Sequence, residues 1–373
     1  MTKLNSKKIF ICATEQSGDN IGYNIIKKLK KIFPNCTFDG VGGNNMSLYL
    51  DHQYFSIKDF KSIGIFEIIF SIKKYINMIS YLSKMIIAKD YDLIITIDSP
   101  DFNYPLIKKI RNKKFKKNTL HIVAPTVWAW RKYRAKKFAK IFNEIFILFD
   151  FERSYFLKYG LNATLIGHPI YYINKIKNDN KKSNIAFLPG SRTHEIDTLM
   201  PFFQIAYQYL IKEKIALDIF IPTLPHLEKK IKEYTKHWKL RIIITSNHNE
   251  IEKFFLDSKF ALVCSGTASL EIAKRNIPQL VIYKLNLFTE IILKFITKIR
   301  YANIINIIEN KMIIPELTNS NLTKNNFLSE FSQLISNSHL NRNQIENINK
   351  TLPKIHSERP PYDIAVEKIS EYL

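Results

Sequence analysis

The sequence is short of cysteine, of acidic residues and of long hydrophobic runs. Its three cysteines, Cys12, Cys36 and Cys264, lie far apart without metal-site or redox spacing, so we expect no disulfide framework and a reducing cytosol. No apolar run reaches about 18 residues, because Glu67 and several lysines interrupt the most hydrophobic segment, 63–87. The N-terminal residues lead into a short strand and not into a signal core. These features exclude a disulfide-stabilised secreted domain and predict no membrane-spanning helix.

The shortage of acidic residues leaves a strongly basic chain. Lys and Arg number 56 against 33 Asp and Glu, which gives a formal net charge of +23 in 373 residues. Such a balance points first to nucleic acid, an anionic membrane or phosphorylated substrates. Nearly all of the basic residues are lysines, however, and Ile and Asn are also abundant. Because an A·T-rich genome produces that bias, base composition explains much of the charge at least as well as binding does.

Length and hydrophobic content predict a folded protein of about two domains. Short apolar runs alternate with longer amphipathic segments, as in parallel sheets covered on both faces. The runs lie at 9–13, 93–97, 120–123, 185–188, 217–221, 241–245, 260–264 and 279–283. A polar linker at 178–184 separates two α/β halves. We expect two doubly wound Rossmann-like domains facing a cleft, 1–177 and 178–359, with a terminal helix at 360–373 packing back on the first.

Three small-residue turns follow predicted strands, at the edge where open parallel sheets bind ligands. They are Ser17-Gly18-Asp19, Gly190-Ser191-Arg192 and Ser265-Gly266-Thr267. Each turn alone is equally well explained as a tight connection. Two such helix starts together with an arginine can hold a diphosphate without a metal. Glu271, about one helical turn beyond Thr267, is placed to bridge ribose hydroxyls, although an ordinary exposed glutamate is the alternative.

Two aspartates, Asp98 and Asp101, follow the apolar run 93–97. A desolvated carboxylate at a strand end can act as a general base. The alternative for one of the two is a helix N-cap, because a helical run begins nearby. His168, in a Gly-His-Pro string, either contacts the substrate or is held by the backbone.

The hydrophobic segment 63–87 is too apolar for an ordinary surface helix and is followed by lysines. Such a segment lies in an anionic membrane interface or forms the floor of a groove for acyl chains. Periodicity alone slightly favours a buried helix pair instead. The residues predicted to contact membrane or acyl chains are Ile63, Ile65, Phe66, Ile68, Ile69 and Phe70.

Taken in order, these strings resemble the lipid-A-disaccharide synthase family along nearly the whole chain. The specific strings are Asp98-Ser99-Pro100-Asp101-Phe102-Asn103 and Trp128-Ala129-Trp130-Arg131. The resemblance also covers 15–19, 40–43, 63–67, 125–127, 167–169, 188–192, 265–271 and 314–317. The sequence departs from the family at three positions: Thr14 and Asn310 stand in place of glycines, and Ile305 precedes Asn306 where the family has proline.

The resemblance implies a two-domain GT-B glycosyltransferase of lipid A synthesis in Gram-negative bacteria. The donor would be UDP-2,3-diacylglucosamine, the acceptor 2,3-diacylglucosamine 1-phosphate, and the products the β-1,6-linked disaccharide 1-phosphate and UDP. Inversion by a single displacement needs a base on the acceptor hydroxyl and charge stabilisation on the leaving diphosphate. No metal or other cofactor is expected.

On this resemblance, Asp101 is preferred over Asp98 as the base, and Arg192 with the 265–267 turn holds the diphosphate. Glu271 and Asn306 are candidates for contacting the nucleotide, and the 17–19 turn lines the cleft. Because the substrates carry acyl chains, the membrane interpretation of 63–87 becomes the favoured one. We expect a cytoplasmic enzyme peripheral to the inner face of the cytoplasmic membrane. Two basic runs, 108–117 and 131–140, would then face the inner leaflet and the acceptor phosphate.

Two alternatives remain open. Another UDP-sugar GT-B enzyme, such as a transferase of peptidoglycan synthesis or a UDP-sugar epimerase, would differ in its acceptor. A nucleic-acid-binding protein would explain the charge of +23, but no recognisable module or aromatic interleaving accompanies the lysine runs. The oligomeric state is not readable from the sequence.

Overall fold

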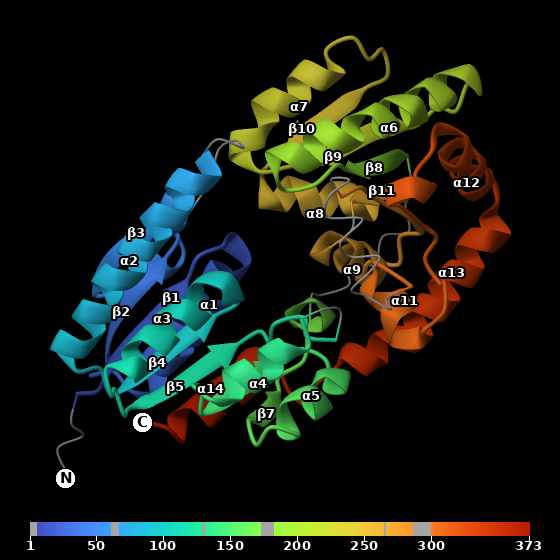
Figure 1. The fold of residues 1–373 in the computed structure, drawn as a ribbon. Helices are drawn as coiled ribbons and strands as arrows, with labels where there is room; N and C mark the ends of the chain where they lie inside the picture. Colours follow the sequence, from blue (N-terminus) through green and yellow to red (C-terminus); the bar gives the residue numbers. More distant parts are fainter. Residues whose placement is uncertain (1–5, 61–66, 129–130, 173–182, 265, 286–299) are drawn as a thin grey trace. The chain divides into compact units, whose positions relative to one another are not determined.

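The chain divides into two compact units. A computed structural model describes residues 6–373 except 61–66, 129–130, 173–182, 265 and 286–299 (Figure 1). Unit 1 consists of Met1–Pro169 and Ile355–Leu373, and unit 2 of Ile170–Lys354. The chain therefore leaves unit 1 slightly before the polar stretch expected as the linker, and it returns to unit 1 at Ile355.

The described part of unit 1 contains a seven-stranded parallel sheet with the order β3-β2-β1-β4-β5-β6-β7. The strands are β1 (Lys8–Ala13), β2 (Thr37–Gly42), β3 (His52–Ser56), β4 (Leu93–Ile97), β5 (Asn118–Ile122), β6 (Glu144–Ile147) and β7 (Asn162–Leu165). The strand order reverses between β1 and β4. Loops that follow these two strands flank the switch point, where open α/β sheets form their ligand crevice.

Helices cover both faces of this sheet. They are α1 (Gln16–Ile32), α2 (Glu67–Lys89), α3 (Pro100–Asn112), α4 (Tyr133–Ala139), α5 (Arg153–Leu157) and α14 (Pro361–Ser370). Successive β1 side chains point to opposite faces: Ile9 packs with α1 and α14, and Phe10 packs with α2 and α3. The C-terminal helix α14, at the red end of the chain in Figure 1, is in contact with α1. The C-terminal helix therefore completes one face of unit 1.

The described part of unit 2 contains a six-stranded parallel sheet with the order β10-β9-β8-β11-β12-β13. The strands are β8 (Asn184–Leu188), β9 (Asp218–Pro222), β10 (Ile242–Thr245), β11 (Ser258–Cys264), β12 (Gln279–Tyr283) and β13 (Glu316–Thr318). The strand order reverses between β8 and β11. The second switch point therefore lies where the sequence predicted two anion-binding turns.

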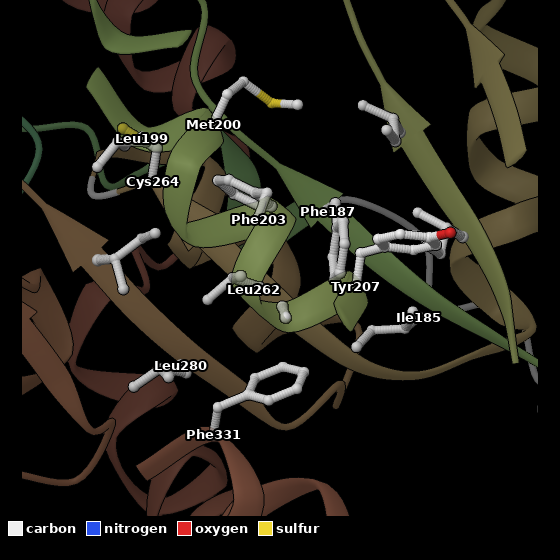
Figure 2. Close-up of a cluster of buried hydrophobic side chains, with 14 of the residues drawn as sticks. Ile185, Phe187, Leu199, Met200, Phe203, Tyr207, Leu262, Cys264, Leu280 and Phe331 are labelled. Atoms are coloured by element: carbon white, nitrogen blue, oxygen red, sulfur yellow. The ribbon is translucent and has the colours of Figure 1, made fainter. Parts of the chain in front are cut away.

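The helices of unit 2 pack around this sheet in the same way. They are α6 (Thr193–Lys212), α7 (Glu228–Thr235), α8 (His248–Leu256), α9 (Thr267–Lys274), α11 (Ile304–Glu309), α12 (Lys324–Ser336) and α13 (Ser338–Thr351). Figure 2 shows the core on one face, where Phe187 of β8 meets Phe203 of α6 with ring centroids 5.1 Å apart. Burial of each such side chain contributes about 1.5–3 kcal/mol. This core fixes the start of α6 relative to β8.

The hydrophobic segment at 63–87 forms a single helix from Glu67 onward, and not a helix pair. Met78 and Leu82 are buried, whereas Ile72 and Ile76 are more than half exposed. Of the predicted membrane contacts, Ile63, Ile65 and Phe66 and the side chains of Ile68, Ile69 and Phe70 lie outside the described residues. No helix in the described ranges is long and apolar enough to cross a membrane.

Candidate active site

The predicted diphosphate turns lie side by side at the switch point of unit 2. Gly190 and Gly266 have φ values of 122° and 135°, a region that residues with a Cβ rarely adopt. A Cβ at Gly190 would also lie 2.6 Å from Glu195 Oε2. Because β8 and β11 pair directly, the turns that follow them are neighbours. Ser265, the first residue of the second turn, lies outside the described residues.

Arg192 is anchored by Glu195, a residue that the sequence analysis did not single out. Arg192 Nη1 donates to Glu195 Oε1 at 3.1 Å, and Glu195 Oε2 accepts the backbone N–H groups of Ser191 and Arg192 at 2.9 and 3.2 Å. Glu195 is buried, while the Arg192 side chain is 59% exposed. The available signal was the spacing of Glu195 three residues beyond the helix cap, as in a capping box.

The charges of Arg192 and Glu195 also affect the pKa of Cys264 on the neighbouring strand β11. Burial, together with the Glu195 charge, raises the pKa of Cys264 to about 12, and Arg192 opposes that shift. Cys264 ends β11, so the guanidinium and both predicted turns occupy one edge of the sheet. An arginine beside two helix N-termini is an arrangement suited to a diphosphate.

Thr267 and Glu271 lie on α9, which begins at the second turn. Thr267 is exposed and starts the helix, and Glu271 is half-buried one turn further along. Both residues therefore lie at or near the same sheet edge as Arg192. Their contact with a nucleotide stays a prediction.

Asn306, by contrast, uses its amide within the protein. It is fully buried, and its Nδ2 donates to Ile314 O at 2.7 Å and to Glu316 Oε2 at 3.3 Å. Its Oδ1 accepts the backbone N–H groups of Ile313 and Ile314. In this arrangement Asn306 supports the 311–315 loop and does not present its amide to a nucleotide.

Asp19 in unit 1 has a similar supporting role. It is fully buried, and its carboxylate accepts backbone N–H groups from Gly43, Asn45 and Met46 at 2.6 to 3.1 Å. These bonds tie the first turn of α1 to the loop that follows β2. Of the predicted 17–19 turn, Gly18 is also buried and Ser17 is exposed. Ser17 is thus the residue of this turn that presents a side chain to solvent.

The loop after β4 holds Asp98 in a strained conformation. Asp98 and Ser99 have φ values of 50° and 46°, which non-glycine residues adopt at a cost and which cluster at functional sites. The buried Asn103 stabilises this loop by donating Nδ2 to Asp98 O at 2.7 Å and to Ile97 O at 3.3 Å. Asp98 itself is half-buried at the carboxyl end of the strand.

Asp101 lies in the first turn of α3 and differs from Asp98 in its surroundings. The N-cap of α3 is Ser99, so the expectation that one of the two aspartates caps this helix is wrong. Asp101 is 79% exposed and forms ion pairs with Arg131, at 3.4 Å, and with Arg134.

Trp128, in the loop after β5, is held by a buried glutamate. Glu152 Oε1 accepts Trp128 Nε1–H at 3.1 Å, and Oε2 accepts the backbone N–H groups of Leu148 and Phe149. Burial raises the pKa of Glu152 to about 7. His168, in the next loop, stacks on Phe149, and burial lowers its pKa to about 4. The backbone N–H of His168 also donates to Ile355 O at 3.2 Å, which agrees with the alternative that the sequence left open, a loop histidine held by the backbone.

Within the described ranges, no group of three or more His, Cys, Asp or Glu side chains is arranged to hold a metal ion. The polar groups at the two switch points are instead arginines, aspartates, small hydroxyl residues and helix N-termini. Such groups bind anions and transfer protons.

The comparison with known families decides between the remaining interpretations. A family model described as lipid-A-disaccharide synthetase matches residues 9–364, which span both units. The chain belongs to this family. The lipid-A-disaccharide synthase of Rickettsia typhi is 36% identical over 379 residues, which cover 98% of this chain and 99% of that protein. The lipid-A-disaccharide synthase of Rhodospirillum centenum is 26% identical over an alignment that covers 97% of this chain and 93% of that protein. As a member of this family, the protein is a glycosyltransferase of lipid A synthesis.

Solved structures confirm the expected two-domain, Rossmann-like GT-B fold class. UDP-GlcNAc 2-epimerase from Neisseria meningitidis, solved with UDP-GlcNAc, aligns with a TM-score of 0.63 at 14% identity, covering 98% of this chain and 100% of that one. MurG from Acinetobacter baumannii aligns with a TM-score of 0.62 at 12% identity, covering 98% and 99%. At these identities the likeness shows the fold alone.

Two departures from the lipid-A-disaccharide synthase pattern have local explanations. Asn310, where the family has glycine, adopts φ 48° at the end of α11, and asparagine tolerates this left-handed conformation. Ile305, where the family has proline, donates its N–H to Asn303 Oδ1 at 2.9 Å, a bond that proline cannot make. At both positions the residue present therefore suits the local backbone.

Proposed function

We infer that the protein transfers 2,3-diacylglucosamine from UDP-2,3-diacylglucosamine to the acceptor 2,3-diacylglucosamine 1-phosphate. The products are the β-1,6-linked disaccharide 1-phosphate and UDP. The observation that carries this inference is the family match over 9–364, which includes the switch-point loops of both units. The residue roles below are proposals built on that match.

Unit 2 supplies the groups that suit the donor diphosphate. Arg192 offers a guanidinium held by Glu195, and α6 and α9 both begin at the same sheet edge. Helix N-termini carry partial positive charge and backbone N–H groups, which stabilise negative charge that develops on the leaving diphosphate. We therefore propose that UDP departs from this edge, with Thr267 and Glu271 beside it.

Unit 1 supplies the base, and we propose Asp98 in preference to Asp101. Asp98 is half-buried and follows β4 in a conformation fixed by Asn103, so its position is defined before substrate binds. Asp101 is exposed and paired with two arginines. A general base must be held where the acceptor hydroxyl attacks, so the half-buried aspartate in a fixed loop at the end of β4 is the better candidate.

Replacing each aspartate by asparagine separates the two assignments. Asp98→Asn should lower kcat by about a hundredfold or more, the usual contribution of a positioned base, with the KM for the donor little changed. Asp101→Asn should keep kcat within about threefold of the wild type. Initial rates of UDP release in detergent micelles, with Arg192→Ala as the control for donor binding, provide the measurement. A larger kcat loss in Asp101→Asn than in Asp98→Asn would reverse the assignment.

We further propose that catalysis needs no divalent metal, since Arg192 and the two helix starts provide positive charge for the diphosphate. Activity should persist after dialysis against EDTA and should not rise when Mg²⁺ is restored. A strict requirement for Mg²⁺ would contradict this part of the proposal.

The surface of α2 supports a membrane-associated enzyme. Ile72 and Ile76 are exposed one turn apart, and Lys73 and Lys74 lie beside them. A groove of about 480 Å³ is lined by Phe55, Lys73, Lys74, Asn77, Met78 and Tyr81. An apolar helix face with flanking lysines suits an anionic lipid interface. We propose that this face, with the preceding residues from Ile63 to Phe70, rests on the inner face of the cytoplasmic membrane.

Charged substitutions on that face provide the test. Ile72→Glu with Ile76→Glu should abolish co-sedimentation with phosphatidylglycerol vesicles while leaving the urea unfolding midpoint unchanged. The matched control is Ile211→Glu with Met312→Glu, which alters exposed apolar residues of unit 2 and should leave vesicle binding intact. Equal binding by both double variants would contradict the membrane proposal.

A further inference from the structure

A basic cavity lies between α3 and α4 of unit 1. Its volume is about 110 Å³, enough for several water molecules. The cavity is lined by Pro100, Asp101, Tyr104 and Pro105 of α3 and by Tyr133, Arg134, Lys137 and Phe138 of α4. On each helix these residues recur three or four positions apart, so they share one face. The two faces enclose a small polar site beside the loop that carries Asp98.

Positive charge dominates this cavity. Arg134 and Lys137 line it directly, and Arg131 contacts the carboxylate of Asp101 from the preceding loop. Arg134 is only 15% exposed, whereas Asp101, which faces both arginines, is 79% exposed. Lys137 Nζ lies 4.6 Å from the centre of the Tyr133 ring. Two arginines thus pair with one solvent-accessible carboxylate, and Lys137 adds a third positive charge to the lining of the same cavity.

The other basic run of unit 1, residues 108–117, has different surroundings. Arg111 donates to the backbone carbonyl oxygens of Ile141, Phe115 and Lys117 and to two side chains. Lys117 lies within 4 Å of Asp90 and Asp92, at the amino end of β4. Residues 113–117 join α3 to β5 at the sheet edge opposite Asp98. Only the 131–137 cluster is therefore near the proposed base.

We propose that Arg131, Arg134 and Lys137 form a subsite for the phosphomonoester of the acceptor, with Asp101 as its exchangeable counter-ion. This proposal rests on the proposed function, which supplies an acceptor with a phosphate on one end of its sugar and the attacking hydroxyl on the other. Arginine presents paired N–H donors that match two phosphate oxygens. An exposed carboxylate contributes little to stability through its ion pairs, so a phosphate dianion displaces it readily. Asp101 then sets the affinity of the subsite and does not take the proton.

The test pairs two acceptors with matched variants in neutral detergent micelles. One acceptor is diacylglucosamine 1-phosphate and the other is the same sugar without the phosphate. Arg134→Ala and Lys137→Ala should lower kcat/KM for the phosphorylated acceptor about tenfold and leave the other acceptor unaffected. Lys136→Ala, which removes the same charge from an exposed position outside the cavity, should change neither. Asp101→Asn should lower the KM for the phosphorylated acceptor severalfold.

The outcomes separate this proposal from the function itself. If the wild type forms no disaccharide from either acceptor, the proposed function fails and the subsite falls with it. If the wild type is active but Arg134→Ala and Lys137→Ala weaken both acceptors equally, or match Lys136→Ala, the subsite assignment alone is overturned. It is also overturned if these variants lose binding to phosphatidate vesicles without any change in acceptor kinetics, because the phosphate would then belong to the lipid surface.

Discussion

At the scale of single residues, buried acids do different work from exposed ones. Glu195 joins two tasks: it accepts backbone N–H groups at the start of α6 and it holds the Arg192 guanidinium. Asp19 accepts backbone N–H groups of the 43–46 loop and, at 3.4 Å, the Gln16 Nε2 group. Each of these two carboxylates lies in a short sequence motif that also contains candidate ligand-binding residues. Only the tertiary hydrogen bonds show whether a carboxylate is already occupied by protein donors or can still bind a ligand.

Substitutions of Glu195 should separate its two tasks. Glu195→Gln keeps an oxygen for the backbone N–H groups but loses the charge that holds Arg192, so kcat/KM for the donor should fall about tenfold with little loss of stability. Glu195→Ala should show the same kinetic loss and also lose about 1 kcal/mol of stability through the cap. Initial rates and urea unfolding measure the two effects. A Glu195→Gln variant with wild-type kinetics would rule out the positioning role.

A buried histidine should make the protein sensitive to acid. His121 is fully buried, is hydrogen-bonded to Thr96 Oγ1 at 2.8 Å, and has its pKa lowered to about 3 by burial. Below pH 6.5 the unfolded chain takes up a proton at His121 that the folded chain does not, so stability falls as pH drops toward 3. At pH 5 the loss from this group is about 2 kcal/mol.

The variant His121→Phe should remove that part of the pH dependence. Urea unfolding at pH 8 and at pH 5 should show a smaller loss of stability in the variant than in the wild type. Glu152, whose pKa is raised to about 7, produces the opposite trend between pH 4.5 and 7, but this contribution is common to both proteins and cancels in the comparison. Identical pH profiles would show that His121 takes no part in acid sensitivity.

At the scale of elements, hydrophobic pattern predicted the central strands well. The runs at 93–97 and 279–283 coincide with β4 and β12, because buried central strands are continuously apolar. No apolar run marks β2, whose sequence contains two glycines and an aspartate, or β13, which has only three residues. These strands form because a neighbouring strand supplies their partners, which is tertiary information that a local pattern lacks.

The C-terminal helix shows the same dependence on tertiary packing. Ile369 and Ala365 of α14 are fully buried in the cluster that contains Ile25 and Leu29 of α1. Ile369→Ala should therefore lower the free energy of unfolding by about 2–5 kcal/mol. Asp363→Ala removes an exposed ion pair with Lys28 and should cost less than about 1 kcal/mol. Comparable urea midpoints for the two variants would contradict the proposed contribution of α14.

The candidate site was predicted in part. Gly190, Arg192, Gly266 and the Asp98/Asp101 pair were selected from strand-end motifs, and the structure places their loops at the two switch points. The sequence preferred Asp101 as the base, whereas the half-buried Asp98 is the base proposed from the structure, and both roles stay predictions. Asn306 was selected from the family pattern, yet its hydrogen bonds are all internal. The burial of a side chain and the number of its hydrogen bonds depend on distant segments that fold against it. Sequence alone therefore does not distinguish a residue that binds a ligand from one that only stabilises the fold.

At the scale of the whole molecule, the net charge of +23 divides into parts with different roles. Some cations are structural, as Arg111 is with its five hydrogen bonds to the protein. Others gather at the functional edges, as Arg192 does in unit 2 and Arg134 in unit 1. The family match favours a phosphorylated lipid substrate, as proposed above, over the nucleic-acid interpretation of this charge. Charge position, and not the total, carries the functional information.

The most direct test of the account is the identity of the product. The purified protein is incubated in micelles with UDP-2,3-diacylglucosamine and 2,3-diacylglucosamine 1-phosphate, and the products are analysed by mass spectrometry and NMR. The account predicts one UDP released for each β-1,6-linked disaccharide 1-phosphate formed. Epimerisation of the donor, or release of UDP without any disaccharide, would contradict it.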